Sequence, residues 1–308
     1  MQTGILTSSI DFASIPRLAA MTQACGYSTR RREVRELTEA DRQQVRQLLA
    51  EDLLRGIHLL GMVDDCGICH PAHRGRFYGY FEDDQLRNVA VLGHHILIYS
   101  ESGLAHLAAK AHEIAASANL LLGPTAQMEH FWSYLATYGR QTRLLSPQYW
   151  MICREARLPL RQSRLQPSRA EHLDEILATQ AELIREQCGI DPRDRDGDGF
   201  RQRVEERIER GRTLVQLRDE KIIFKAELIS DSASAVYLES IWTHPDYRGR
   251  GMATTGVAEL AHRFLSQGKS LAILVEPEEV AARHLYERIG FICEEDYQAR
   301  FLKPLACC

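Results

Sequence analysis

The alternation of apolar and polar residues predicts two strand–turn–strand units built to the same plan. The first, RFYGYFEDDQLRNVAVL, covers residues 76–92, and the second, RTLVQLRDEKIIFKAEL, covers residues 212–228. Both are rich in the β-branched and aromatic residues that strands favour. Acidic pairs at 83–84 and at 219–220 predict the turns between the strands. The two units lie 136 residues apart (212 minus 76).

An amphipathic helix is predicted upstream of each unit. Thr38-x-x-Asp41 in the first half and Ser168-x-x-Glu171 in the second have the spacing of a capping box, which starts a helix. The apolar positions that follow recur at helical spacing: Val45, Leu48, Leu49 and Leu53 in the first half, and Leu173, Ile176, Leu177 and Ile184 in the second.

The repeated order of elements indicates a duplicated α/β unit. We expect a poorly ordered leader over residues 1–31, a first domain over 32–156 and a second over 157–308. The junction falls in RLPLRQSRLQP, residues 157–167. Two unrelated α/β segments would give a similar pattern, so they stand as the alternative.

The bulk composition narrows the class of protein. With 308 residues, 44% of them apolar and 26% charged, the chain has the size and composition of two globular domains. A net charge of -4 does not favour nucleic-acid binding, and no apolar run approaches the ~20 residues that cross a bilayer. The leader lacks an apolar signal core, and the eight cysteines are scattered. We therefore expect a cytoplasmic protein with reduced thiols.

One segment carries a recognisable binding loop. VYLESIWTHPDYRGRGMATTGVAELAHRF, residues 236–264, predicts a strand that ends near Thr243, a break at His244-Pro245, and then a helix. The turn between them contains two glycines and two arginines within residues 248–253. Such a turn exposes backbone N–H groups at the positive end of a helix, which suits a pyrophosphate.

Among nucleotide-binding loops, this one fits a single type. The Gly-Lys-Ser/Thr ending of a Walker loop is absent, and so is the third glycine of the Rossmann fingerprint. Arg248-x-x-Gly251-x-Ala253 fits the R/Q-x-x-G-x-G/A loop of the GCN5-related N-acetyltransferases (GNAT). A strand over 271–275 and a helix that ends in Tyr286-x-x-x-Gly-Phe follow in the same order as in that family.

The second half therefore resembles a GNAT acetyltransferase over about residues 162–302. The whole chain resembles two-domain bacterial members whose N-terminal half is a degenerate copy. The resemblance implies tandem GNAT-like domains, each with a mixed, mostly antiparallel sheet flanked by helices. It also implies direct transfer of an acetyl group from acetyl-CoA to a primary amine.

By the same resemblance, acetyl-CoA should lie in a V-shaped opening between the strand that ends at Thr243 and the strand that starts near Leu271. The residues implied to contact the coenzyme are Ile241, Trp242 and Thr243 on the strand, Arg248, Gly249, Arg250, Gly251, Met252, Ala253 and Thr254 in the loop, and Glu279 and Tyr286 further on. No metal is expected in the reaction. The expected partner is a small-molecule or peptide amine, cationic in one reading; the sequence does not fix the oligomeric state.

Catalytic roles follow from the match. Tyr286 stands at the family's tyrosine near the coenzyme sulfur and is the expected general acid. Glu239 is the first choice for the base, with Glu227 and Glu276 in reserve. Two positions depart from the family: Glu279 replaces a frequent asparagine, and Leu274 stands where many relatives have a catalytic glutamate. These departures keep open a non-catalytic acyl-CoA-binding module as the alternative function.

The first half offers no such loop. After its comparable strand, ILIYSESGLAHLAAKA contains one glycine and no arginine. We expect this half not to bind the coenzyme, and to support the second half or shape the acceptor site.

Two further motifs suggest a metal-dependent sensor as a third function. Residues 194–205 match the spacing of a calcium loop, and Cys66-Gly-Ile-Cys69-His70, with His73 nearby, offers zinc or haem ligands. Arg201 stands at the calcium loop's eighth position, which prefers an apolar residue, and Gly189 and Pro192 break the incoming helix. We interpret the acidic stretch as a helix start.

Overall fold

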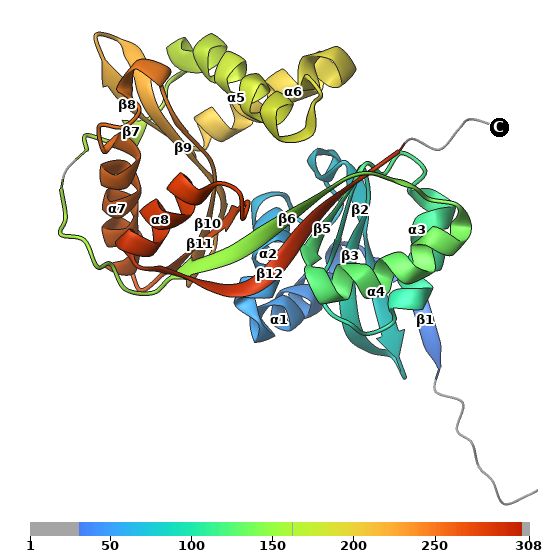
Figure 1. Cartoon of the computed structure of the whole chain (residues 1–308). Coiled ribbons are helices and arrows are strands. Elements are labelled where there is room, and N and C mark those ends of the chain that lie inside the picture. The colour runs from blue at the N-terminus through green and yellow to red at the C-terminus, as the bar shows by residue number, and fades with distance from the viewer. Residues whose placement is uncertain (1–30, 162, 304–308) are drawn as a thin grey trace, which may run out of the picture.

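The computed structural model describes residues 31–161 and 163–303 (Figure 1). The leader predicted over 1–31 therefore lies outside the described residues, apart from Arg31. The first half contains β1 (Arg32–Glu36), α1 (Arg42–Glu51), α2 (Leu53–Cys66), β2 (Gly75–Glu82), β3 (Gln85–Gly93), β4 (His95–Ile98), α3 (Leu104–Ile114), β5 (Leu120–Pro124), α4 (Thr125–Leu135) and β6 (Thr142–Cys153).

The second half repeats this order of strands and helices. It contains β7 (Gln166–Pro167), α5 (Leu173–Cys188), α6 (Pro192–Glu209), β8 (Thr213–Arg218), β9 (Lys221–Asp231), β10 (Ala235–Thr243), α7 (Met252–Leu265), β11 (Ser270–Val275), α8 (Val280–Ile289) and β12 (Phe291–Leu302). The duplication predicted from the sequence is therefore visible in the order of the elements.

The two predicted hairpins have the same register. Tyr80 pairs with Asn88 in the first, and Gln216 pairs with Phe224 in the second, each position shifted by 136 residues. Each hairpin has a register irregularity directly after that pair. The turn residues at 83–84 and at 219–220 have φ between 49° and 61°. Left-handed backbone at both central positions matches the twist of the flanking strands, so the acidic turns are confirmed.

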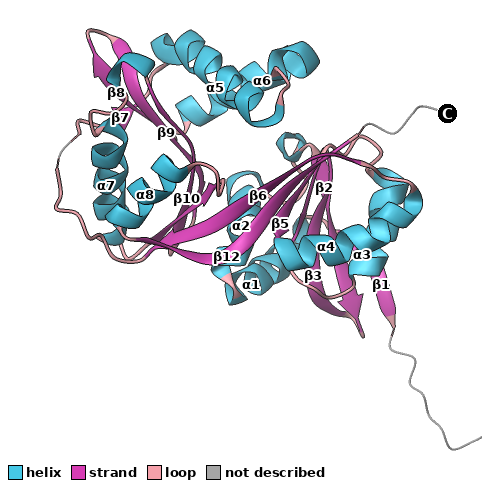
Figure 2. Cartoon of the chain, viewed as in Figure 1, coloured by secondary structure: helices cyan, strands magenta, loops and turns pink. Residues whose placement is uncertain are grey.

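The last strand of each half crosses into the other half. The strands form one sheet in the order β1-β2-β3-β4-β5-β12-β6-β11-β10-β9-β8-β7. β6 thus lies between β11 and β12 of the second half, and β12 lies between β5 and β6 of the first, as the long crossing pair in Figure 2 shows. Each half completes its sheet with a strand from the other. The boundary at 156/157 stays a prediction, since strand pairing crosses it.

One of the two predicted helix starts is wrong by a residue. Thr38 and Asp41 form the expected capping box. In the second half the cap is Arg169, whose backbone N–H donates to Nδ1 of His172 at 3.0 Å. Ser168 still belongs to the extended chain, because its backbone N–H donates to the Thr213 carbonyl at 2.8 Å. The helical geometry therefore begins one residue later than the sequence pattern predicts.

Helices cover both faces of the second half's sheet. α7 and α8 pack on one face, and Gly256 allows α7 to come close, since a Cβ there would lie 2.6 Å from the Phe224 ring. α5 and α6 cover the outer part of the other face, around Trp242. α2 of the first half covers the remainder, where Ile57 and Tyr237 share a buried cluster. The first half thus supports the second, as expected.

No helix in the described ranges is both long enough and apolar enough to cross a bilayer.

Candidate active site

The central strands of the second half separate at the predicted place. β10 and β11 pair in parallel only from Ala235–Ser270 to Leu238–Ile273. Beyond that point β10 continues to Thr243 paired with β9, and β11 continues to Val275 paired with β6. The backbone of Ile241 to Thr243 therefore has no strand partner on the β11 side within the described part of the chain. The region between the two strands beyond Leu238 and Ile273, where their pairing ends, is called the opening below.

A bulge in β10 lies at the apex of this opening. Glu239 pairs with Glu227, but the next pair joins Trp242 to Lys225, so β10 has one extra residue. Ser240 lies in the bulge with φ of 53°, a left-handed conformation that is uncommon for a residue with a side chain. The bulge could not be predicted from the sequence because no glycine marks it.

The glycine-rich loop has the backbone expected of an anion site. Gly249 and Gly251 have φ of 71° and 78°, and a Cβ at either position would meet no atom within 4 Å. Gly251 is the N-cap of α7, so the amides of Met252 to Thr254 belong to the helix's first turn, where backbone donors lack partners inside the helix. Such donors at the start of a helix suit an anion, and the space around both glycines is open.

Three arginines surround the loop. Arg248 donates from Nε to the Thr243 carbonyl at 3.1 Å, and the guanidinium groups of Arg250 and Arg218 lie 5.5 and 5.6 Å from the centre of the Tyr247 ring. Within the described residues, none of the three forms an ion pair with a carboxylate. Arg218, on β8, was not predicted, because it lies thirty residues from the loop in sequence (248 minus 218).

Tyr286 lies on α8 and is 7% exposed, with its ring against Phe291. Burial, with a smaller contribution from Glu279, raises the pKa of its phenol well above the usual value. The hydroxyl therefore stays protonated through the neutral range, as a general acid requires. Within the described residues, the hydroxyl forms no hydrogen bond. Tyr286 also belongs to the core beneath α7 and α8, so packing alone accounts for its presence, and its role as general acid stays a prediction.

The three candidate bases differ in their surroundings. Glu239 accepts a hydrogen bond from the Tyr237 hydroxyl at 2.5 Å, and burial raises the pKa of its carboxyl. Burial would also raise the pKa of Glu227, but Lys225 at 2.8 Å and Arg207 at 3.1 Å occupy its two oxygens and lower it. Of these two carboxylates, Glu239 is therefore the one whose surroundings favour the uptake of a proton.

Glu276, the other reserve, follows β11 directly. Its Oε1 accepts hydrogen bonds from Ser146 at 3.0 Å and from Gln148 at 3.3 Å, both on β6 of the first half. The first half thus contributes side chains at the edge of the opening, which the sequence could not indicate.

The positions that depart from the family pattern lie as follows. Glu279 is exposed at the N-cap of α8, and its side chain makes no capping hydrogen bond. Leu274 is half-buried beside the cluster formed by Ile57 and Trp150. A carboxylate at position 274 would enter an apolar contact, so the leucine is consistent with packing against the first half.

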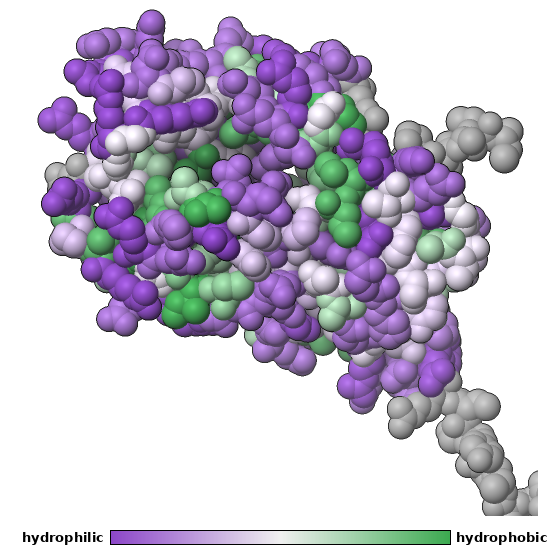
Figure 3. All heavy atoms as spheres, viewed as in Figure 1, coloured by the Kyte–Doolittle hydropathy of each residue, from purple (hydrophilic) through white to green (hydrophobic). Residues whose placement is uncertain are grey.

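Apolar residues line a surface hollow on this half. In the space-filling view, the surface beside α8 is hollowed and shows hydrophobic residues surrounded by hydrophilic ones (Figure 3). Such a surface is typical of a small-molecule site.

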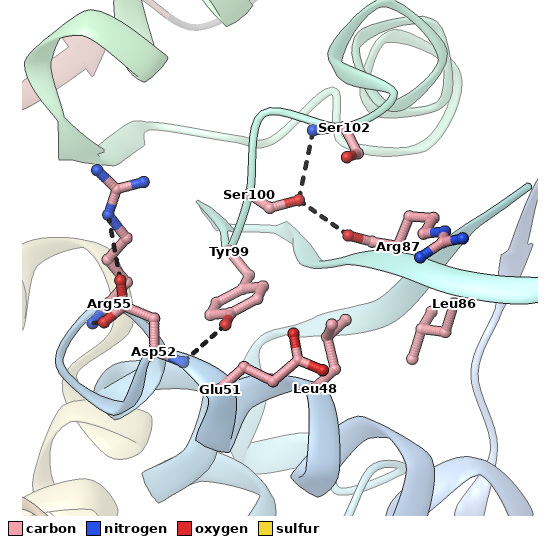
Figure 4. Close-up of a pocket in the computed structure, with 9 residues that line it drawn as sticks. All are labelled: Leu48, Glu51, Asp52, Arg55, Leu86, Arg87, Tyr99, Ser100 and Ser102. Atoms are coloured by element: carbon pink, nitrogen blue, oxygen red, sulfur yellow. Dashed lines mark hydrogen bonds and ion pairs between the residues drawn. The ribbon is translucent and has the colours of Figure 1, made fainter.

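The first half differs at the corresponding loop. Gly103, the N-cap of α3, has φ of 70°, but a Cβ there would lie 2.3 Å from the Tyr80 ring. The Tyr80 ring therefore packs against this loop, whereas no atom lies within 4 Å of a Cβ built at Gly249 or Gly251; that the first half does not bind the coenzyme stays a prediction. A cavity of about 370 Å³ lies nearby, between α1 and the β4–α3 loop (Figure 4). It is lined by Leu48, Glu51, Asp52, Arg55, Leu86, Arg87, Tyr99, Ser100 and Ser102.

The two motifs that resemble metal-binding sequences do not form metal sites among the described residues. The acidic stretch lies inside α6, which is kinked at Asp196, and Asp196 accepts a hydrogen bond from the Gly199 amide at 3.1 Å. Asp196 therefore starts the second helical part of α6, in agreement with the interpretation of the stretch as a helix start. His73 Nε2 lies 2.8 Å from the Gly67 carbonyl. Over residues 31–161 and 163–303, no group of three or more His, Cys, Asp or Glu side chains is arranged to hold a metal ion.

Comparison with known proteins gives the second half the same family as the resemblance of its sequence motifs did. Residues 176–291 match the acetyltransferase (GNAT) family. The fold is similar to a GNAT-family acetyltransferase from Colwellia psychrerythraea (14% identity, 88% of this chain and 100% of that one, TM-score 0.52). It is also similar to a GCN5-related N-acetyltransferase from Sphaerobacter thermophilus (12% identity, 88% of this chain and 95% of that one, TM-score 0.54). A third similar structure is a tandem GNAT protein from the clavulanic acid biosynthesis pathway (11% identity, 90% of this chain and 100% of that one, TM-score 0.54).

At these identities the likeness shows the fold, which confirms the predicted tandem architecture. No curated protein matches the chain.

Proposed function

Because the second half of the chain belongs to the acetyltransferase (GNAT) family, we propose that the protein transfers an acetyl group from acetyl-CoA to a primary amine by direct attack. One observation carries the proposal. The separation of β10 from β11 and the open glycine loop at the start of α7 lie on the same strand–loop–helix unit. An extended thioester and its pyrophosphate need these two features side by side.

The coenzyme would be held by backbone and charge. The amides of residues 249–254 and the guanidinium groups of Arg248 and Arg250 would bind the pyrophosphate. The unpaired backbone of Ile241 to Thr243 would bind the extended arm as an added strand would. Acetyl-CoA supplies an activated acyl group, so no protein nucleophile is required.

Two side chains would move protons. The acceptor arrives as an ammonium ion, and Glu239 would remove one proton so that the nitrogen lone pair can form the C–N bond. As the C–S bond breaks, the electron pair stays on sulfur, and Tyr286 would give that sulfur its proton. The nitrogen's second proton would restore the phenol, so one proton is released in each turnover. Placing both substrates between these groups supplies the remaining catalysis.

The test is calorimetric titration of the purified chain with acetyl-CoA. Gly251→Glu places a carboxylate in the open space beside the predicted pyrophosphate site. Gly268→Glu is a matched control, because Gly268 has φ of 77°, a Cβ there would also meet no atom within 4 Å, and it lies beyond the opposite end of α7. We expect micromolar binding by the parent and Gly268→Glu, and no heat from Gly251→Glu. Absence of binding by the parent would refute the proposal.

Turnover separates an enzyme from a non-catalytic acyl-CoA-binding module. Release of CoA is followed by chromatography, since exposed Cys69 and Cys293 would react with thiol reagents. The amines to test are a polyamine, an aminoglycoside, an amino acid and a peptide N-terminus. Loss of turnover in Tyr286→Phe, with acetyl-CoA binding retained, would support the enzyme. Binding without turnover in the parent for every amine would favour the binding module.

A further inference from the structure

The second half contains a buried polar cluster beside the β10 bulge. The side chains of Lys225 and Glu227, on β9, are 0 and 1% exposed. Lys225 Nζ donates to Glu227 Oε1 at 2.8 Å and to Gln180 Oε1, on α5, at 2.7 Å. Gln180 Nε2 in turn donates to Ser240 Oγ at 2.9 Å. A continuous chain of hydrogen bonds therefore runs from a buried ion pair to the residue in the bulge.

The first half serves as an internal control. With the shift of 136 residues set by the hairpins, Val89 and Val91 stand where Lys225 and Glu227 stand in the second half. Val91 pairs with Leu97, as Glu227 pairs with Glu239. The bulge is absent as well, because the Tyr99 amide donates to the Val89 carbonyl only two residues later. The fold therefore needs neither the polar cluster nor the bulge, and both occur only in the half that has the open coenzyme loop.

The direction of each hydrogen bond follows from the donors available. Lys225 can only donate, so it must meet the oxygen of the Gln180 amide. The Gln180 amide nitrogen must then face Ser240, and Ser240 Oγ must accept. The hydroxyl proton of Ser240 is therefore free, and among the described residues Ser240 donates a side-chain hydrogen bond to none.

This free donor lies where the chemistry would take place. Ser240 follows Leu238, the last residue of β10 paired with β11, by two positions and is half-buried. Its side chain faces α5, on the side of the sheet opposite α7 and α8. The left-handed backbone at Ser240 is held against its own preference, which is typical of a functional position.

We propose that Ser240 donates a hydrogen bond to the thioester oxygen during transfer, and that Gln180, Lys225 and Glu227 position it; this rests on the proposed acetyl transfer. As the amine nitrogen forms the C–N bond, the C=O π pair moves onto oxygen. The pair returns when the C–S bond breaks and its electrons leave on sulfur. A fixed donor at that oxygen lowers the barrier because it meets charge that develops only in the transition state.

The test is the variant Ser240→Gly. Glycine accepts the positive φ without strain, which offsets the loss of the hydrogen bond from Gln180, so the variant should remain folded. Because the donor is lost, kcat should fall by ~100-fold, whereas the Kd for acetyl-CoA should stay within about twofold. Ser234→Gly, in the exposed turn between β9 and β10, is the matched control and should leave kcat unchanged.

A second variant tests the positioning. In Gln180→Glu, the carboxylate beside Lys225 accepts from the Ser240 hydroxyl and so turns the donor away from the thioester. We expect the same fall in kcat, with acetyl-CoA binding retained. The double variant Ser240→Gly/Gln180→Glu should lose no more than either single one, since both remove one interaction.

The outcomes are distinct. The rate measured is the release of CoA, with the amine from the list above that gives the fastest turnover. If no amine is accepted, the rate is that of thioester hydrolysis, which passes through the same oxyanion. Turnover by Ser240→Gly within about twofold of the parent would overturn the inference and leave the proposed function standing. Loss of both kcat and acetyl-CoA binding would overturn it in favour of a structural role. If the parent binds no acetyl-CoA or releases no CoA, the proposed acetyl transfer itself fails.

Discussion

The buried pair Lys225–Glu227 allows a quantitative prediction, because the first half shows the same strand with valines at both positions. Nearly all of both side chains is removed from solvent, and the Nζ–Oε1 distance is 2.8 Å. Breaking such a pair by removing one partner costs about 3–5 kcal/mol, because the other charge stays buried. Replacing both partners by apolar residues is often close to neutral.

We expect Lys225→Val to cost ~3 kcal/mol, the lower end of this range, because Glu227 keeps Arg207 at 3.1 Å. Glu227→Val should cost ~4 kcal/mol or more, because Lys225 would keep only the neutral Gln180. The double variant Lys225→Val/Glu227→Val should cost only ~2 kcal/mol, mainly for the Gln180 oxygen that loses its donor. The Arg207 side chain is 25% exposed and can turn to water.

The assay is urea denaturation followed by tryptophan fluorescence, with a common m-value checked across the variants. A variant that is unfolded before any urea is added counts as a loss of at least the parent's stability. The reasoning would be refuted if the double variant lost the sum of the two single losses to within ~0.5 kcal/mol, since the two side chains would then not be coupled.

Three further predictions follow from other parts of the molecule. Tyr237→Phe should move the acid limb of the pH profile of kcat to higher pH, because the hydrogen bond from Tyr237 lowers the pKa of Glu239. An acid limb at the same pH as in the parent would exclude Glu239 as the base. Burial lowers the pKa of His58 from 6.5 to about 4, so its contribution to stability is present above pH 6.5 and is lost as pH falls towards 4. His58→Phe should reduce this loss of unfolding free energy, measured by urea titration at each pH, by up to ~3 kcal/mol. An unchanged dependence of the unfolding free energy on pH would contradict the prediction. Residues 157–308 expressed alone should not fold, because β6 is missing from their sheet. Coexpression with residues 32–156 should yield a complex of the two fragments that co-purifies. A cooperative melting transition of residues 157–308 alone would disprove the shared sheet.

The glycine-rich loop of the second half could be predicted because its backbone depends on short segments. The loop around Gly251 needs a strand, a turn with positive φ and a helix start in succession, and each leaves a local pattern of residues. The acidic turns were readable for the same reason. The cap at Ser168 was misplaced because a long-range hydrogen bond to Thr213 keeps that residue extended. Local patterns do not report such contacts.

The surroundings of the candidate catalytic residues depended on residues far apart in the sequence. Ser240 resembles any strand serine until Gln180, sixty residues earlier, fixes its hydroxyl. Glu227 resembles an available base until Lys225 and Arg207 occupy its oxygens. The charge and hydrogen-bond state of a side chain is set by the groups that share its desolvated space, and only the folded chain brings them together.

The sequence by itself determined the duplication, the order of strands and helices, and the glycine-rich loop before α7, since each is encoded in local periodicity and spacing. Only the tertiary structure decided that the halves exchange β6 and β12, and that the first half lines the second half's opening through Ser146 and Gln148. The physical reason is that a strand's alternating pattern shows that it will pair but carries no information on which partner it meets. That choice depends on how the two halves pack around one sheet.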